Sequence, residues 1–455
     1  MGKRTFRSQK SKHFVLRIIH VACLAQEAMS LYACMAYAVE NSSKKKIQDA
    51  DNADALVSRR DAILKAFTPK VSAGTYAYSN FGRAVDPETN TYISSTSFNN
   101  GYSVDGSITL FDGFSALNNI KISNIAVKMG ISQEQKLRDE ICLSVMEAYY
   151  NVLFHTQMVE VMESQIEAAR SNLTLVKKQL ELGQKGRADV VQMEADLADR
   201  EYQLINSRNQ KDEAVLTLKA LMLWPVEEVL PVDMSAVRDS FELPEICMES
   251  AAEITSFAHE NNPAVRIAKG KMDQARYELK TAKWQFLPSL SLNGGWSTSY
   301  YTYPGRKDYQ AIPFGTQFRN NGGEYIQLSL SIPIYDRLSR HSNLSKKKND
   351  WRRAQAEYEQ TLHDVESEIS RAIQDSKGAL AAFFQAEKRS VVQEEAYRLG
   401  ERKMLQGLIS PIEFQTVSND YLNAKAEQLN ARFQYLLKSS VVSYYKGISY
   451  LDQYK

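Results

Sequence analysis

The stretch ELGQKGRADVVQ, residues 181–192, interrupts what otherwise reads as one very long helix. An apolar stripe at helical spacing runs up to it without a break, and the sequence of residues 193–222 is helical again. Gly183 and Gly186 each weaken a helix interior by about 1 kcal/mol relative to alanine. The two glycines therefore predict a turn that divides this part of the chain into two helices.

The composition excludes several classes of protein. The 455 residues carry a net charge of +2, which gives no basic surface for nucleic acid. The four cysteines are scattered, without a CxxC pair or a histidine at ligand spacing, so we expect neither a disulfide framework nor a metal site. The sequence contains no run of roughly 18 apolar residues that could form a transmembrane helix. No catalytic or phosphate-binding motif is apparent, so we expect no enzyme activity and no cofactor.

The amino terminus has the order of a secretory signal. A basic segment comes first and an interrupted apolar run follows it. We expect residues 1–28 to form an export signal that is cleaved after Ala25 or Ala28. Cys23 suggests a lipoprotein box, but His20 occupies the position where leucine is expected. A small buried cysteine is therefore the favoured interpretation of Cys23.

The chain repeats one plan twice, at a shift of about 220 residues, which is far longer than a solenoid repeat. The matched landmarks keep the same order in both copies. They are AVENS at 38–42 with AHENN at 258–262, Pro69 with Pro288, Asp112 with Asp336, Gly183 with Gly407, and Asp189 with Glu413. A series of landmarks in one order predicts an internal duplication.

Each copy carries the same expected elements: a helix, two strands, a long helix, a turn and a shorter helix. We expect the first copy at residues 30–222 and the second at 251–447, with an irregular insertion at 223–250 and a tail at 448–455. The expected helices are 30–66, 115–182, 188–222, 251–286, 337–406 and 412–447, and the expected strands are 71–80, 101–111, 289–300 and 323–335. Pro69 and Pro288 end the first helix of each copy, because proline disfavours a helical residue before it.

The long helices indicate an elongated molecule. A helix of about 70 residues is about 100 Å long, more than a compact domain of this size can hold. The two shorter helices of each copy, stacked end to end, match this length as an antiparallel partner. Apolar residues of the first long helix step alternately by four and three, which predicts a coiled-coil seam. That seam is Ile141, Val145, Ala148, Val152, His155, Val159, Met162, Ile166, Ala169, Leu173, Val176 and Leu180.

Two features qualify this seam. His155 is interpreted as a helix-packing residue and not as a ligand. The equivalent stripe of the second long helix is smaller and more polar, which predicts looser packing; it is Val365, Ile369, Ala372, Ser376, Ala379 and Phe383.

The expected strands alternate between apolar and polar residues. In YSVDGSITL, Tyr102, Val104, Ile108 and Leu110 share one face and small polar residues share the other. An ordinary half-buried sheet would give this pattern. Strand lengths of about ten residues, aromatic residues at the strand ends and small polar side chains on one face favour a membrane β-barrel. Four strands cannot close a barrel, so the barrel must be shared; a dimer would supply eight strands and a trimer twelve.

Over about residues 30–447 the chain resembles the TolC-like outer membrane efflux protein family. The motifs that carry the resemblance are SLYACMAYAVENS, FLPSLSLNGG, LFDG, LSLSIPIYD, LGQKGRADVVQMEADL and QGLISPIEFQTVSNDYL, together with the two-copy layout. The resemblance implies a mixed α and β membrane protein of a Gram-negative bacterium. It is expected to be a homotrimer, with a shared 12-stranded β-barrel in the outer membrane and an α-helical coiled-coil barrel across the periplasm. Residues 223–250 would join an equatorial belt.

The implied function is a passive exit duct of a tripartite efflux or type I secretion system. The duct would receive substrates from an inner-membrane pump of the RND or ABC type through a periplasmic adaptor. An alternative from the residues alone is a periplasmic adaptor or other coiled-coil scaffold. That alternative explains the heptads and glycine turns but not the two pairs of strands. The sequence does not name the cargo.

The resemblance also implies roles for the two glycine turns at the periplasmic tip. The adaptor would contact Leu182, Gly183, Gln184, Gln406, Gly407 and Leu408. The acid six residues after each glycine, Asp189 or Glu413, would lie near a narrow aperture and favour cations; each acid could equally cap the helix that follows its turn. A salt-bridge latch implied by the family would need an arginine at 409 and an acid at 416, where this chain has Ile409 and Thr416. Pro69, Asp112, Pro288 and Asp336 would mark the junctions between helices and strands.

Overall fold

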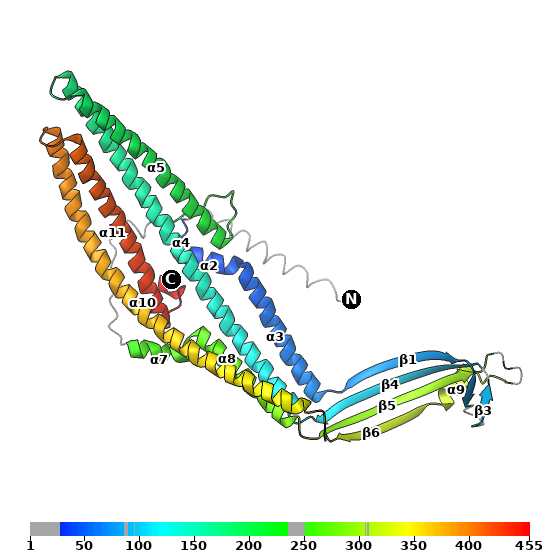
Figure 1. Cartoon of the computed structure of the whole chain (residues 1–455). Coiled ribbons are helices and arrows are strands. Elements are labelled where there is room, and N and C mark those ends of the chain that lie inside the picture. The colour runs from blue at the N-terminus through cyan, green and yellow to red at the C-terminus, as the bar shows by residue number, and fades with distance from the viewer. Residues whose placement is uncertain (1–27, 86–89, 95, 235–250, 305, 307–308) are drawn as a thin grey trace, which may run out of the picture. The chain divides into compact units, whose positions relative to one another are not determined.

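A computed structural model of the chain describes residues 28–85, 90–94, 96–234, 251–304, 306 and 309–455 (Figure 1). The predicted signal sequence with Cys23, apart from residue 28, and residues 235–250 of the predicted insertion lie outside the described residues. The structure divides into two compact units. Unit 1 comprises residues 1–49, 132–266 and 360–455, and unit 2 comprises residues 50–131 and 267–359.

The described elements follow the expected order in both halves of the chain. Those of the first half are α2 (Leu31–Asn41), α3 (Ser43–Phe67), β1 (Lys70–Asn80), β2 (Arg83–Val85), β3 (Tyr92–Ser94), β4 (Ser97–Phe111), α4 (Ser115–Glu181) and α5 (Arg187–Met222). Those of the second half are α7 (Ala251–Asn261), α8 (Pro263–Trp284), β5 (Ser289–Thr302), α9 (Phe314–Asn320), β6 (Gly323–Ser331), α10 (Ser339–Leu405), α11 (Pro411–Tyr445) and the 3₁₀ turn η1 (Asp452–Tyr454). The parallel order supports the predicted two-copy plan, and the duplication itself stays a prediction.

Two predicted helices are wrong in their continuity. The helix expected at 30–66 breaks at Ser42, whose hydroxyl accepts a hydrogen bond from the Lys45 backbone N–H at 3.3 Å. The helix expected at 251–286 breaks at Asn262, whose side-chain oxygen accepts from the Ala264 N–H at 2.8 Å. In both places the polar side chain accepts a hydrogen bond from a backbone N–H in the first turn of the next helix, where no helical carbonyl is available to that N–H.

Unit 2 is built around a four-stranded antiparallel sheet in the order β1-β4-β5-β6. The strand predicted at 323–335 is shorter than expected, because β6 ends at Ser331. Pro333 follows shortly after, and proline has no N–H for a strand ladder. The β2–β3 hairpin and helix α9 were not predicted. Along this sheet β1 and β6 form the two edges, each paired on one side only.

Unit 1 has its main hydrophobic core around the middle of α4. Three residues of the predicted seam, Val145, Ala148 and Val152, are buried in this core. The rest of the seam is buried elsewhere along α4, except for Ile141, His155 and Leu180, which are half-buried. Residues of other segments complete this core, among them Cys34 and Met35 from α2, Leu218 and Met222 from α5, Trp224 and Leu230 after α5, Phe433 from α11, and Tyr450 near the carboxyl end. The predicted tail at 448–455 therefore takes part in the fold, and the Tyr454 hydroxyl lies 3.1 Å from the hydroxyl of Tyr150 on α4.

In the described part of the chain, no helix combines the length with the apolar composition that crossing a bilayer requires.

Candidate functional site

The turn between α4 and α5 ends the first helix in a Schellman motif. The Gly183 N–H donates to the Leu180 carbonyl at 2.9 Å, and the Gln184 N–H donates to the Gln179 carbonyl at 2.8 Å. Gly183 has φ +71°, a left-handed conformation that costs glycine little and other residues much more. The predicted turn at Gly183 is therefore present, and its geometry explains the residue type.

The turn between α10 and α11 repeats this geometry. The Gly407 N–H donates to the Met404 carbonyl at 3.1 Å, and the Leu408 N–H donates to the Lys403 carbonyl at 2.9 Å. Gly407 has φ +73°. Two of the carbonyls that each helix end leaves without a partner are therefore satisfied inside the turn, so both turns have the same defined backbone geometry.

Asp189 and Glu413 each cap the helix that follows their turn. The Asp189 carboxylate accepts a hydrogen bond from the Gly186 backbone N–H at 3.0 Å. The Glu413 carboxylate accepts from the Ser410 backbone N–H at 2.7 Å, and the Ser410 hydroxyl accepts from the Glu413 N–H at 3.2 Å. These bonds from the Ser410 backbone and side chain lower the pKa of Glu413. The capping role left open by the sequence is thus present at both turns; a role at an aperture stays a prediction.

The turns expose apolar side chains to solvent. Leu182 is 73% exposed, Leu408 is 69% exposed, and Ile412 in the first turn of α11 is 61% exposed. Directly behind them lies a buried apolar cluster, which is Leu173, Val176, Val190, Met193, Met404 and Phe414. A rigid apolar cluster under exposed leucines makes these turns suitable for contact with another protein.

Polar contacts tie the two helical hairpins, α4–α5 and α10–α11, together near the turns. The Asn172 side chain donates to the Glu401 carboxylate at 3.2 Å, and the Gln179 side chain donates to the Leu405 carbonyl at 3.1 Å. Ile409, at the position where the family latch would need an arginine, packs against the apolar cluster behind the turns.

A buried ion pair that the sequence analysis missed also joins the hairpins. Arg200 and Asp196 of α5 are 3% and 6% exposed, and Arg200 Nε lies 2.8 Å from Asp196 Oδ2. The guanidinium also donates to the Ser418 hydroxyl of α11 at 2.9 Å and to Gln165 Oε1 of α4 at 3.4 Å. The signal was available: Asp196 and Arg200 continue the spacing of Val190 and Met193 on the buried face of α5.

In unit 2, the four predicted junction residues lie between helices and strands. Pro69 directly precedes β1 and Pro288 directly precedes β5. Asp112 Oδ2 accepts from the Ala116 N–H at 2.9 Å and so caps α4. Asp336 Oδ2 accepts from the Arg340 N–H at 3.1 Å and caps α10 in the same way. The two residues after each aspartate have positive φ, so the chain turns into both long helices with the same backbone conformation.

The register of the sheet separates an apolar face from a polar face. Directly paired residues share a face, and Val104 pairs with Ala73 on one side and with Trp296 on the other. The same face carries Ile326 and Leu328, which are 86% and 62% exposed. The opposite face carries small and polar residues, namely Ser72, Gly74, Ser103, Asp105, Ser107, Asn293, Ser297, Gln327 and Ser329, together with the tyrosines Tyr76, Tyr78, Tyr301 and Tyr325.

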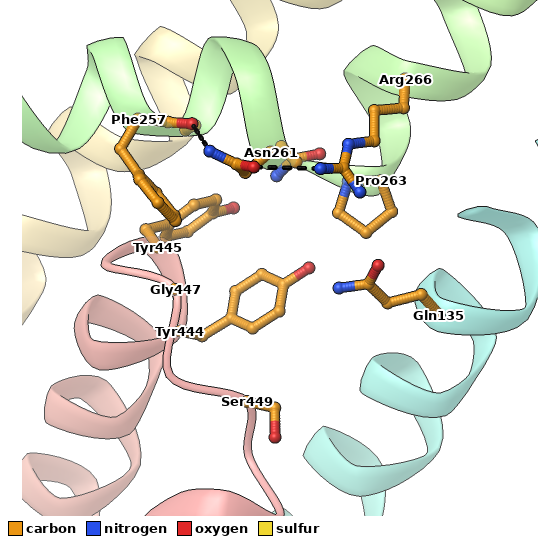
Figure 2. Close-up of a pocket in the computed structure, with 11 residues that line it drawn as sticks. Gln135, Phe257, Asn261, Pro263, Arg266, Tyr444, Tyr445, Gly447 and Ser449 are labelled. Atoms are coloured by element: carbon orange, nitrogen blue, oxygen red, sulfur yellow. Dashed lines mark hydrogen bonds between the residues drawn. The ribbon is translucent and has the colours of Figure 1, made fainter. Parts of the chain in front are cut away.

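A pocket in unit 1 lies where α7 and α8 meet the end of α11 (Figure 2). Tyr444 and Phe257 line it beside Asn261 and Arg266. The polar groups bond within the protein: the Asn261 amide donates to the Phe257 carbonyl at 3.1 Å, and Arg266 donates to the Asn261 oxygen at 3.0 Å. We interpret this pocket as a packing junction. Among the described residues, no group of three or more histidine, cysteine, aspartate or glutamate side chains could hold a metal ion.

The fold matches that of known channels. The chain superposes on the transmembrane channel protein CusC with a TM-score of 0.76 over 92% of each chain, at 14% identity. The described structure is mostly helical with a four-stranded antiparallel sheet, and that combination is the fold of TolC-like channels.

Similar sequences come from secretion and efflux proteins. The chain is 24% identical to the outer membrane protein TolC of Escherichia coli over 306 residues, which are 65% of this chain and 59% of TolC. It is 21% identical to the alkaline protease secretion protein AprF of Pseudomonas aeruginosa over 316 residues, which are 68% of this chain and 62% of AprF. The matched part thus spans about three fifths of the length of these relatives.

A family model described as outer membrane efflux protein matches residues 49–222 and 255–440, well over half of the chain. The predicted resemblance and the predicted location in a Gram-negative outer membrane are confirmed. The family model that matches is not one of periplasmic adaptors or scaffolds, which was the alternative from the sequence. The matching family is one of channels and not of enzymes. This chain belongs to the outer membrane efflux protein family.

Proposed function

We propose that three copies of this chain form an outer membrane exit duct. The observation that carries the proposal is a four-stranded sheet with one exposed apolar face and two edges, β1 and β6, that are paired on one side only. Open strand edges are not tolerated in lipid, so the edge β6 of one copy would pair with β1 of the next. Three sheets would then close a 12-stranded barrel, apolar toward lipid and polar toward a water-filled lumen.

The helices would extend this duct through the periplasm as a coiled-coil barrel. Residues 30–222 and 251–447 would form two copies of one structural plan in each chain. Residues 223–250 would belong to an equatorial belt. Substrates would enter from an inner-membrane pump, of the RND or ABC type, through a periplasmic adaptor. The duct itself would perform no chemistry, and the pump would select the cargo.

The two glycine turns would be the contact with the adaptor. Leu182, Gly183 and Gln184 would meet it at one turn and Gln406, Gly407 and Leu408 at the other. The exposed leucines and the fixed Schellman geometry support this assignment. Asp189 and Glu413 from three copies would surround the aperture and favour cations.

Substitution of Gly407 by arginine tests the proposal. Gly407→Arg places a long cation at the proposed contact, and we expect it to abolish export from cells while trimers still assemble in the outer membrane. Gly82→Arg is the matched control, because Gly82 also has positive φ and has no atom within 4 Å of an added Cβ. Export by Gly407→Arg at the level of the control would make the adaptor contact wrong. Recovery of the protein in the soluble fraction, without detergent, would make the duct itself wrong.

A further inference from the structure

Helix α9 lies at the loop end of the sheet, beside β5 (Figure 1). The pairing of β5 with β6 stops at Ser297 and Gly323, whereas β5 continues to Thr302. Beyond that point α9 replaces the missing strand. The Gln317 side chain accepts from the Tyr301 N–H at 3.0 Å and donates to the Tyr301 carbonyl at 2.8 Å, as a paired residue in a ladder would do.

Further hydrogen bonds fix α9 to the same part of β5. The Thr298 hydroxyl donates to the Phe318 carbonyl at 2.7 Å, and the Asn321 amide donates to the Ser299 carbonyl at 2.8 Å. Thr298 is 4% exposed and Gln317 is 2% exposed. Buried polar groups with satisfied partners hold a segment in one position, so α9 is a fixed part of the sheet and not a loose loop.

The aromatic contacts of α9 show which face of the sheet it covers. The ring of Phe318 lies 5.4 Å from that of Tyr102 and 5.5 Å from that of Trp296. The ring of Phe314 lies 5.4 Å from that of Tyr300. Tyr102, Trp296 and Tyr300 all belong to the apolar face by the strand register. The helix therefore lies on the apolar face, at the end of the sheet that bears the loops.

The outer side of α9 changes from apolar to polar. Phe314 is 45% exposed, although its inner edge packs on the sheet. Arg319 and Asn320, at the carboxyl end of the helix, are exposed. On the same face and nearer to the helical end of the sheet, Ile326 and Leu328 expose apolar surface, and the exposed Glu324, which pairs with Trp296, lies between them and α9. A boundary of aromatic rings between apolar and polar surface is typical of a membrane–water interface.

We propose that α9 is an interfacial anchor that contacts the lipid headgroups at the loop end of the sheet. Phe314 and Arg319 both lie at the headgroup level, where the ring meets the glycerol-proximal parts of the acyl chains and the guanidinium meets the lipid phosphates, and the hydrogen bonds of Gln317 transmit this position to β5. The anchor thereby determines how deep the sheet sits in the bilayer. This inference rests on the proposed function, because it requires the apolar face to contact lipid.

Spin labels in the full chain test the anchor. Single cysteines are introduced as Phe314→Cys, Leu328→Cys and Phe81→Cys, with the four native cysteines replaced by alanine. The labelled protein is reconstituted into vesicles of phosphatidylcholine and phosphatidylglycerol. Collision with oxygen, which concentrates in hydrocarbon, is compared with collision with a water-soluble nickel chelate.

We expect the label at 328 to favour oxygen and the label at 81, on an 82% exposed loop residue, to favour nickel. The label at 314 should lie between them and closer to the label at 328. A label at 314 that is as open to nickel as the label at 81 would overturn the anchor and leave the duct intact. Nickel access at 328 would contradict the duct as well. If Phe314→Cys does not assemble, Thr316→Cys on the same helix supplies the comparison, with an oxygen-to-nickel ratio above that at 81 expected.

Discussion

Helices α4 and α10 each have 67 residues, but they place side chains of different size at equivalent buried positions. When Gly183 is aligned with Gly407, Val152 corresponds to Ser376 and Val176 corresponds to Gly400. Val152 and Val176 are 2% and 1% exposed and belong to large apolar clusters. The second helix carries small residues in the same positions.

At Gly400 of α10 the apolar volume that a valine would supply comes from another helix. A Cβ added to Gly400 would lie 3.4 Å from Val417 and 3.6 Å from Phe414, so side chains of α11 occupy the space that a valine holds in the first copy. The seam position is the same in both copies, but α4 supplies its own apolar volume whereas α10 receives it from its partner helix. Burial of a seam therefore depends on both helices of a hairpin.

The shorter helices α5 and α11 also differ at an equivalent buried position, but here the first copy is the more polar one. Arg200 of α5 corresponds to Ala424 of α11, which is fully buried. The first copy thus has a buried charge where the second has a methyl group. A buried ion pair contributes little net stability over apolar packing, but loss of one partner leaves an uncompensated charge.

The largest expected effect comes from removing Arg200. Arg200→Ala leaves Asp196 buried and unpaired, and we expect a loss of about 3–5 kcal/mol in the free energy of unfolding. Chemical denaturation of the detergent-solubilised protein measures this loss. Arg208→Ala is the control, since Arg208 pairs with Glu163 on the surface, and exposed pairs contribute about 0–1 kcal/mol. Equal losses in both variants would show that the Arg200 pair is not buried in the folded protein.

The next effect compares the two seams directly. Val152→Ser removes apolar volume and buries a hydroxyl, which should destabilise the protein by about 2–3 kcal/mol. Ser376→Val makes the reverse change at the half-buried equivalent position, and we expect a change of less than about 1 kcal/mol in either direction. Thermal unfolding of both variants in one detergent makes the comparison. A loss at Ser376 as large as that at Val152 would mean that the second seam is packed as tightly as the first.

The sequence predicted what depends on local pattern. The seam of α4 and the turns at Gly183 and Gly407 follow from spacing and from residue type. The break at Ser42 was missed because apolar periodicity continues across it and the hydroxyl that caps the next helix is its only local mark. The break at Asn262 was missed although Pro263 follows directly, and proline disfavours a helical residue before it. Helix α9 was missed because its stability comes from contacts with β5 and not from its seven residues.

In the candidate site, too, local sequence predicted the residues but not the contacts between helices. Asp189 and Glu413 could be recognised as caps or as aperture acids, and their spacing is equally consistent with both. The Arg200 pair needed three helices to be brought together before its role was visible. The aperture, the adaptor contact and the shared barrel are properties of an assembly of several chains, so no local pattern in one chain encodes them by itself.

An effect of similar size, which appears only as the pH changes, should come from Asp139, which corresponds to the exposed His363 of the second copy. Asp139 is 6% exposed, and among the described residues its Oδ2 has no hydrogen-bond partner. Burial raises the pKa of Asp139 to about 6, against the smaller opposing effects of a hydrogen bond from Tyr444 and the charge of Arg138.

The pH dependence follows from this shift. Below the ordinary pKa of aspartate both the folded and unfolded states are protonated, so Asp139 carries no penalty there. As the pH rises from about 4 to about 6, the unfolded state loses its proton first, and stability should fall by about 2–3 kcal/mol. Asp139→Asn should flatten this part of the profile, whatever its effect on stability at a single pH. Parallel profiles for the two proteins between pH 4 and 7 would contradict the assignment.

The smallest expected effect separates the two roles of the turn acids. Asp189→Asn and Glu413→Gln remove the charges, but an amide oxygen can still accept from the N–H of Gly186 or Ser410. The double amide variant should therefore unfold within about 0.5 kcal/mol of the parent and show a weaker cation preference in planar bilayers. Asp189→Ala with Glu413→Ala should also lose the hydrogen bonds to the Gly186 and Ser410 N–H groups, and with them about 0.5–1 kcal/mol for each helix, while the Ser410 hydroxyl still caps α11. An unchanged reversal potential under a salt gradient, in the amide variant, would leave the acids as caps alone. A shifted potential with unchanged stability would instead assign the charge to the aperture and the oxygen atoms to the helix.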